Sequence, residues 1–152
     1  MDSSRSGCSR RGPAGFAVFA LAFLVLASGC SGGTVVAPGR TVAVTILDFK
    51  LVATSHAVPA GSLRLTLQNR GPSTHELVVI RTDRPADSLP LLPDGLTVDE
   101  DASSIRVVDE DSDIPIGATA VLDLRLARGR YVLFCNLSGH YLGGMHLSLV
   151  AT

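Results

Sequence analysis

Short runs in which apolar and polar residues alternate constrain the fold of this chain more than any other feature. Residues 63–67 read Leu-Arg-Leu-Thr-Leu, and residues 122–126 read Leu-Asp-Leu-Arg-Leu. Such a period of two gives a strand one apolar face and one polar face. No segment after the N-terminal region sustains a helical period, so the sequence predicts an all-β fold.

The predicted strands follow one another at short intervals and are separated by glycine and proline turns. They cover Thr41–Phe49, 63–67, His75–Ile80, 122–126, Arg130–Cys135 and Met145–Val150. Strands of this length with such turns are typical of an antiparallel β-sandwich. The exception is Thr82–Pro115, which has four prolines and many acidic residues. We predict that it forms a long acidic excursion with a short helix around Asp87–Leu92.

Composition limits the size and the partners of the domain. The 152 residues, 46% of them apolar, suffice for one domain with a core and are too few for two large ones. The net charge of −1 gives no reason to expect a nucleic-acid partner. With no Trp, two Tyr and five Phe, the chain offers few aromatic platforms for stacking bases or sugars.

The N-terminus has the pattern of an export signal. Three arginines precede the uncharged stretch 12–29, whose apolar centre, Phe16–Ala27, is too short to cross a bilayer comfortably. The stretch ends Leu-Ala-Ser-Gly-Cys and resembles the bacterial lipobox, which implies lipidation of Cys30. Ala27 stands where the lipobox has Leu, so ordinary signal cleavage is the alternative. We therefore predict a signal peptide at 1–29, a flexible tether at 30–40 and one folded domain at 41–152.

The cysteine count becomes informative after processing. Cys8 leaves with the signal and Cys30 carries the lipid, so Cys135 is the one thiol expected in the folded domain. An unpaired thiol in an oxidising compartment needs something that holds it. This points to a metal ligand.

Potential metal ligands recur at regular spacing near the C-terminus. Cys135, His140 and Met145 lie five residues apart on one segment, and His75 stands at the start of an earlier predicted strand. Two imidazoles, a thiolate and a thioether form the ligand set of a mononuclear blue-copper site. A soft thiolate stabilises Cu(I), imidazole suits both oxidation states, and a weak axial thioether disfavours the tetragonal geometry of Cu(II).

The pattern Cys-x4-His-x4-Met beside the last strand of a β-rich chain resembles the cupredoxins. The resemblance covers about Thr41 to Val150, and residues 135–146 are similar in sequence to the corresponding segment of sulfocyanin-like proteins. It implies a Greek-key β-sandwich that binds one copper ion. It also implies equatorial ligation by His75, Cys135 and His140, with Met145 in the axial position.

Neighbouring residues exclude related sites and leave two details open. A binuclear copper centre needs a second cysteine where Gly139 stands, and a multicopper oxidase needs histidines on both sides of its cysteine. Many small cupredoxins have an asparagine after the first histidine; Glu76 occupies that place here, and strand alternation points it away from the metal. Asn69 or Asn136 are candidates for pinning the ligand loops instead. We interpret His56 and His146 as ordinary surface residues.

The predicted function is electron transfer by a protein that is not an enzyme. The expected partner is a redox protein such as a cytochrome or an oxidase, and the protein is expected to be a monomer anchored by lipid on the periplasmic or extracellular side. The acidic residues 99–113 are interpreted as a solvated loop, or else as a docking surface for a basic partner. The alternative function is storage of copper or its delivery to an oxidase, with His56 and His146 as transfer ligands.

Overall fold

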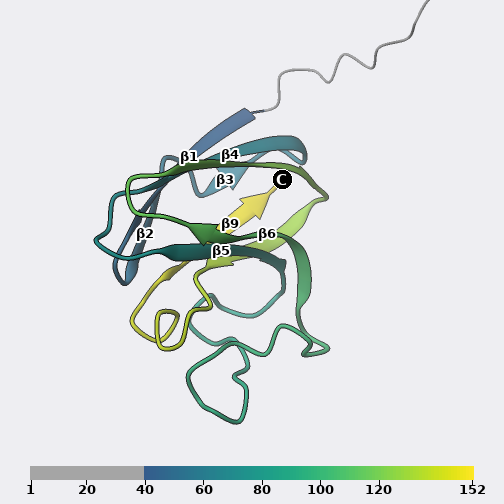
Figure 1. Cartoon of the computed structure of the whole chain (residues 1–152). Helices are drawn as coiled ribbons and strands as arrows, with labels where there is room; N and C mark the ends of the chain where they lie inside the picture. The colour runs from purple at the N-terminus through teal and green to yellow at the C-terminus, as the bar shows by residue number, and fades with distance from the viewer. Residues whose placement is uncertain (1–39) are drawn as a thin grey trace, which may run out of the picture. The chain divides into compact units, whose positions relative to one another are not determined.

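The computed structural model describes residues 40–152 and shows an all-β fold in this part of the chain (Figure 1). It contains nine strands and no helix. The strands are β1 Arg40–Leu47, β2 Lys50–Ala53, β3 Ala57–Val58, β4 Gly61–Asn69, β5 His75–Arg81, β6 Arg106–Ile114, β7 Thr119–Leu126, β8 Gly129–Phe134 and β9 His146–Ala151. The prediction of an all-β fold is confirmed.

The strands form two sheets, one ordered β2-β1-β4-β7 and the other β3-β9-β8-β5-β6. Most neighbouring strands are antiparallel, as predicted for a β-sandwich. Two pairs, β1 with β4 and β3 with β9, run parallel, so both sheets are mixed. Period-two alternation does not distinguish parallel from antiparallel pairing, because either neighbour is compatible with one buried face.

Burial explains why the alternation is clear in some strands and absent in others. In β4 the leucines Leu63, Leu65 and Leu67 are at most 2% exposed, and the residues between them are half-buried or exposed. In β5 and β8 four consecutive residues are buried. These two strands are covered on both faces: the main core lies on one side, and a second cluster built from Val78, Ile80, Leu89, Val98, Val132, Phe134 and Tyr141 lies on the other.

The segment predicted as an acidic excursion divides into two parts, and this corrects the prediction for 82–115. Residues 82–105 loop over the outer face of the five-stranded sheet, where the Tyr141 hydroxyl accepts a hydrogen bond from Leu89 N and donates one to Ala86 O. The helix predicted around Asp87–Leu92 is absent. Residues 106–114 form strand β6 at the edge of the sheet. Its charged side chains concealed the strand, because acidic residues are compatible with an edge strand whose outer face meets water.

The strand registers define two ends of the sandwich. His75 pairs with Ile114, and Phe134 pairs with His146, so β5 and β9 begin where β6 and β8 end. We call this the metal end, since the ligand candidates lie there. At the other end Arg81 pairs with Arg106, Gly129 with Ala151, and β1 begins at Arg40. We call this the arginine end.

Several predictions fall on residues outside the described part. The signal peptide at 1–29, the lipidation of Cys30 and the tether up to residue 39 lie there, whereas Arg40 opens β1. Among residues 40–152 no helix has the length and apolar character needed to span a membrane.

Two isoleucines, one at the end of β6 and one just after it, differ in burial and allow a matched pair of substitutions. Ile114 is 0% exposed at the end of β6, and Ile116, two residues later, is 62% exposed. Ile114→Ala leaves a cavity, so we expect it to lower the free energy of unfolding by about 2–4 kcal/mol. Ile116→Ala is expected to change it by less than about 0.5 kcal/mol. Urea denaturation of the metal-free protein measures both, and similar values for the two variants would contradict the observed place of this segment in the core.

Candidate metal centre

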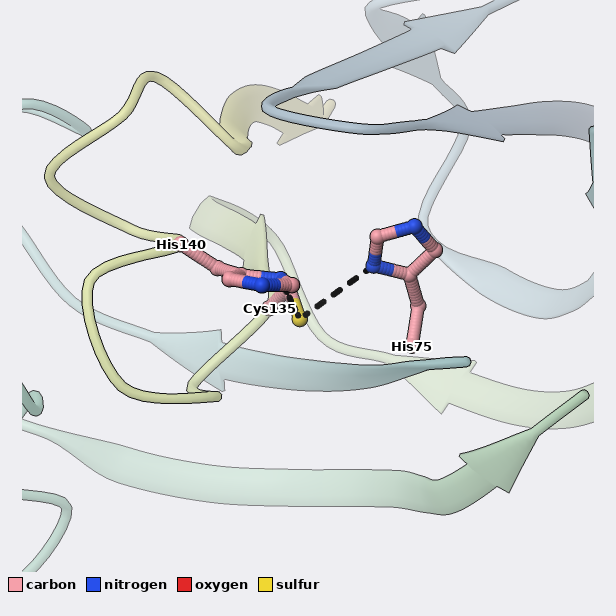
Figure 2. Close-up of side chains that lie close together, drawn as sticks. All are labelled: His75, Cys135 and His140. Atoms are coloured by element: carbon pink, nitrogen blue, oxygen red, sulfur yellow. Dashed lines mark hydrogen bonds between the residues drawn. The ribbon is translucent and has the colours of Figure 1, made fainter. Parts of the chain in front are cut away.

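Three metal-ligating side chains converge at the metal end. His75 is the first residue of β5, Cys135 directly follows β8, and His140 lies on the loop that leads to β9 (Figure 2). One donor atom from each residue lies within 4.8 Å of the others. The Cys135 Sγ is 4.0 Å from His75 Nδ1 and 3.4 Å from His140 Nδ1. Both imidazoles therefore direct the same ring nitrogen toward the sulfur.

The loop from Cys135 to Met145, which carries three of the four predicted ligands, is closed by backbone hydrogen bonds. His140 N donates to Leu137 O, Met145 N donates to His140 O, and Cys135 N donates to Met145 O at 3.0 Å. The last bond sets the backbone of Met145 beside that of Cys135. The Met145 side chain is fully buried at this place. Gly144 has a φ of 101°, a left-handed conformation that favours glycine and lets the loop turn back into β9.

Burial shifts the pKa values of two ligand candidates away from their charged forms. His75 and Cys135 are 0% exposed, and His140 is half-buried. Burial raises the pKa of the Cys135 thiol, although backbone N–H groups of Glu76 and Leu137 act in the opposite direction. Burial and then the nearby His75 lower the pKa of His140. A bound cation would reverse the effect on Cys135, since it favours a thiolate, and would reinforce the effect on His140, since it favours a neutral imidazole.

The ring of His75 is oriented by a carboxylate that sequence reasoning missed. Its Nε2 lies 2.9 Å from Asp48 Oδ1, and Ser73 Oγ donates to the second carboxylate oxygen at 3.0 Å. Gly71 makes room for this contact: a Cβ there would lie 2.6 Å from Asp48 Oδ1. With Nε2 donating to Asp48, Nδ1 keeps its lone pair for a metal ion. Such a carboxylate partner fixes the ring and increases its basicity.

The turn between β1 and β2 also covers the ligand loop. Phe49 has a φ of 57°, which is unusual for a residue other than glycine. Its ring stands edge-on to that of His140, with centroids 5.3 Å apart. A Cβ on Gly143 would collide with the Phe49 ring. The same tight turn therefore supplies Asp48 to His75 and Phe49 to His140.

Two buried or half-buried asparagines hold the ligand segments, as the sequence suggested for Asn69 or Asn136. Asn69 donates to Ser73 O and Ile114 O and accepts from Gly71 N, so it fixes the segment just before His75. Asn136 accepts from Val98 N at 2.7 Å and donates to Val98 O and Glu100. It therefore links the loop after Cys135 to the segment 82–105. Each asparagine anchors one ligand segment to another part of the sandwich.

The remaining candidates lie outside the three-residue cluster. His56 is exposed, and its Nδ1 lies 3.0 Å from Ser148 O. His146 is half-buried, and its ring centroid lies 5.1 Å from that of Tyr141. Glu76 is half-buried, and burial raises the pKa of its carboxyl, which receives the backbone N–H of Asn136. None of the three has a donor in the cluster found among the described residues.

The chemistry of the donors fits a copper ion. A lone buried thiol and two imidazole nitrogens aimed at it suit a metal that accepts both soft sulfur and nitrogen ligands. Met145 is fully buried, and its thioether would complete the donor set of a type 1 site, which takes one copper ion. His75 and Cys135 are fully buried beside the packed strands β5 and β8, so the fold sets their positions.

Comparisons with known proteins identify the fold. No family model and no curated protein matches this sequence. Solved structures do match. The chain is 17% identical to auracyanin from the photosynthetic bacterium Roseiflexus castenholzii, with a TM-score of 0.55 over 75% of this chain and 98% of the other. It is 24% identical to auracyanin B, with a TM-score of 0.56 over 76% and 91%.

A rusticyanin from Thiobacillus ferrooxidans is similar as well. It is 16% identical, and the TM-score is 0.54 over 75% of this chain and 79% of the other. Auracyanin and rusticyanin are cupredoxins, so the predicted cupredoxin fold is confirmed.

The raised thiol pKa predicts how metal binding depends on pH. Near neutral pH the Cys135 thiol is protonated and His140 is neutral, so binding a cation releases the thiol proton. The apparent affinity for Cu(I) should therefore rise about tenfold per pH unit below the thiol pKa. Competition with a chromophoric chelator across a pH series measures it. The Cys135→Ser variant should lose this dependence, and a flat profile for the unmodified protein would contradict the assignment of Cys135.

The contact between Asp48 and His75 predicts a loss of metal affinity on substitution. Asp48→Ala removes the acceptor that orients the imidazole, and we expect copper affinity to fall about 10–100-fold. Asp123→Ala is the matched control, because Asp123 pairs with Arg64 on the four-stranded sheet away from the centre. The same chelator competition compares them. Equal affinities for the two variants would show that Asp48 has no part in holding His75.

Proposed function

We propose that this protein binds one copper ion in a type 1 site and carries electrons by Cu(I)/Cu(II) cycling. The observation that carries the proposal is the convergence of His75, Cys135 and His140, with their donor atoms within 4.8 Å of one another. When bound, copper supplies the one-electron chemistry. The protein would supply the ligands His75, Cys135, His140 and Met145 and the packing that holds them.

The rigidity of the centre supports electron transfer. His75 is held by Asp48, the segment before it by Asn69, and the base of the ligand loop by the bond from Cys135 N to Met145 O. Ligands restrained in this way keep nearly the same positions in both oxidation states. Little reorganisation is then needed when an electron arrives or leaves.

His140 is the proposed route by which electrons pass between the centre and the surface. It is the one half-buried member of the cluster, whereas His75 and Cys135 are fully buried. The Phe49 ring packs edge-on against it, and Phe49 and the nearby loop residue Leu142, each 51% exposed, add apolar surface. A partner that packs against this apolar surface would bring its redox centre close to the His140 ring.

The similar proteins are consistent with this function. One matched auracyanin structure is of a dithionite-reduced form, and one matched rusticyanin is described as a copper protein. For the present chain we propose export, a lipid anchor at Cys30 and a position on the periplasmic or extracellular side. The proposed partner is a redox protein such as a cytochrome or an oxidase, and we propose that the carrier is a monomer and has no enzymatic activity.

Copper delivery to an oxidase is the competing function. It would need additional donors to receive the ion from the centre. His56 and His146 were the candidates, and they contact Ser148 O and Tyr141 and contribute no donor to the cluster. Rates of copper transfer to an apo-oxidase, compared with rates of electron transfer to a cytochrome, separate the two functions.

The proposed centre has a direct spectroscopic test. Adding Cu(II) to the metal-free protein should give the intense blue absorption of a copper–thiolate bond, together with a reversible wave at an electrode. Cys135→Ser should abolish the colour, because it removes the thiolate. His56→Ala should leave both properties unchanged, because His56 lies outside the cluster. A colourless Cu(II) form of the unmodified protein would refute the proposal.

A further inference from the structure

Positive charge gathers on one side of the molecule, away from the metal centre. The described residues include ten basic residues, and six of them form what we call the arginine surface: Arg81, Arg84, Arg106, Arg125, Arg128 and Arg130. All six are exposed. They come from the end of β5, the start of β6, the end of β7 and the start of β8, together with the adjoining loops. Six arginines that are spread over 50 residues of the sequence thus lie at one end of the fold.

The arginine surface lacks acidic partners. Among residues 40–152 the ion pair between Arg64 and Asp123 is the one contact of an arginine or lysine with a carboxylate. Arg81 instead donates to Arg128 O at 3.0 Å, and Arg84 donates to Ser104 Oγ at 3.0 Å and Ser88 O at 3.3 Å. These neutral acceptors hold two of the side chains in place and leave their charges uncompensated.

Like charges also face each other across two strands. Arg81 of β5 and Arg106 of β6 are direct partners in the antiparallel register. Such a pair destabilises a sheet in isolation, because the two charges repel. An anion placed between the two guanidinium groups would turn this repulsion into attraction.

Two hollows lie among these arginines. One, of about 320 Å³, is lined by Arg81, Arg106 and Arg125, and a shallower one of about 690 Å³ is lined by Arg81, Arg84 and Arg106 together with Ser103 and Ser104. Three of the thirteen acidic residues of the described part line them: Asp83, Asp109 and Asp123. Asp123 is already paired with Arg64. Both hollows are open and offer guanidinium and hydroxyl donors, which suit phosphate groups.

We propose that the arginine surface binds the anionic phosphate groups of a phospholipid bilayer. Several exposed arginines spread over two open hollows match a plane of many headgroups better than one small anion. The aromatic residue lining these hollows, Tyr131, is 2% exposed, so no stacking platform for a nucleic acid accompanies the charges. Because the proposal rests on charges at the arginine end, it does not depend on a metal ion or on the proposed electron transfer.

The arginine surface lies at the end of the domain where the N-terminal segment joins it, opposite the metal end. β1 begins at Arg40 at the arginine end, so the preceding segment, which contains the predicted lipidation site Cys30, joins the domain there. His75, Cys135 and His140 lie at the opposite ends of β5 and β8. A domain resting on its arginine surface would therefore hold its metal end away from the bilayer, where a soluble partner can reach His140.

The test is vesicle binding by a chain that begins at Ser31 and therefore lacks both the signal and the lipidated cysteine. Every buried side chain of the two hydrophobic clusters lies between residues 42 and 151, so this chain keeps the described core. We expect it to sediment with vesicles of phosphatidylglycerol and phosphatidylcholine at low salt. We expect little binding to pure phosphatidylcholine, and release at high salt because screening weakens the attraction. Arg106→Gln with Arg125→Gln should weaken binding about thirtyfold, since each basic residue contributes about a fivefold factor.

The matched control removes the same charge from the metal end. Lys50 and Arg70 lie next to Leu47 and Asn69, and Lys50→Gln with Arg70→Gln should bind vesicles nearly as well as the unmodified chain. Far-ultraviolet circular dichroism verifies folding, and Arg128→Gln with Arg130→Gln replaces the first pair if that pair is unfolded. Equal loss in control and test pairs, or no binding to phosphatidylglycerol, would overturn the proposal. Retention of an acidic redox protein in place of vesicles would assign the surface to a protein and overturn it as well.

Discussion

The side chain of Asn69 makes the contacts on which the metal end of this sandwich depends. Asn69 ends β4 in one sheet, and its amide reaches Ile114 O at the end of β6 in the other sheet, as well as Gly71 N and Ser73 O before β5. It is 0% exposed, so these bonds form where water cannot replace them. They join the two sheets and set the position at which β5 begins. His75 is the first residue placed by that arrangement.

The centre built on this frame combines buried polarity with restrained geometry. Two imidazole nitrogens and one thiol sulfur lie close together, and burial disfavours both the thiolate of Cys135 and the protonated form of His140. A bound cation would stabilise the thiolate and the neutral imidazole. Asp48 holds one ring from outside, and Phe49 packs against the other. One tight turn therefore acts on both histidines. Copper suits a donor set of one thiolate and two imidazoles. Ligands that are held in place favour rapid electron exchange.

The cluster of positive charge and the predicted metal ligands lie at opposite ends of the molecule. Uncompensated arginines occupy the end where β1 begins, and the ligands occupy the other end. Acidic residues follow β6 toward the metal end, so a basic partner and an anionic bilayer would be drawn to different places. A carrier fixed by one end and open at the other can meet soluble partners without leaving the surface to which it is bound. The two proposals are thus compatible, although each rests on its own residues.

The sequence by itself determined the all-β class and nominated His75, Cys135, His140 and Met145, because alternation and loop spacing are local properties of the chain. The strand β6 escaped prediction, since edge strands tolerate charges that otherwise indicate a loop. The two parallel pairings and the contact between Asp48 and His75, 27 residues apart, were decided by the tertiary structure. So was the arginine surface. Pairing, side-chain contact and charge clustering join residues distant in sequence, and only the folded chain specifies which of them meet.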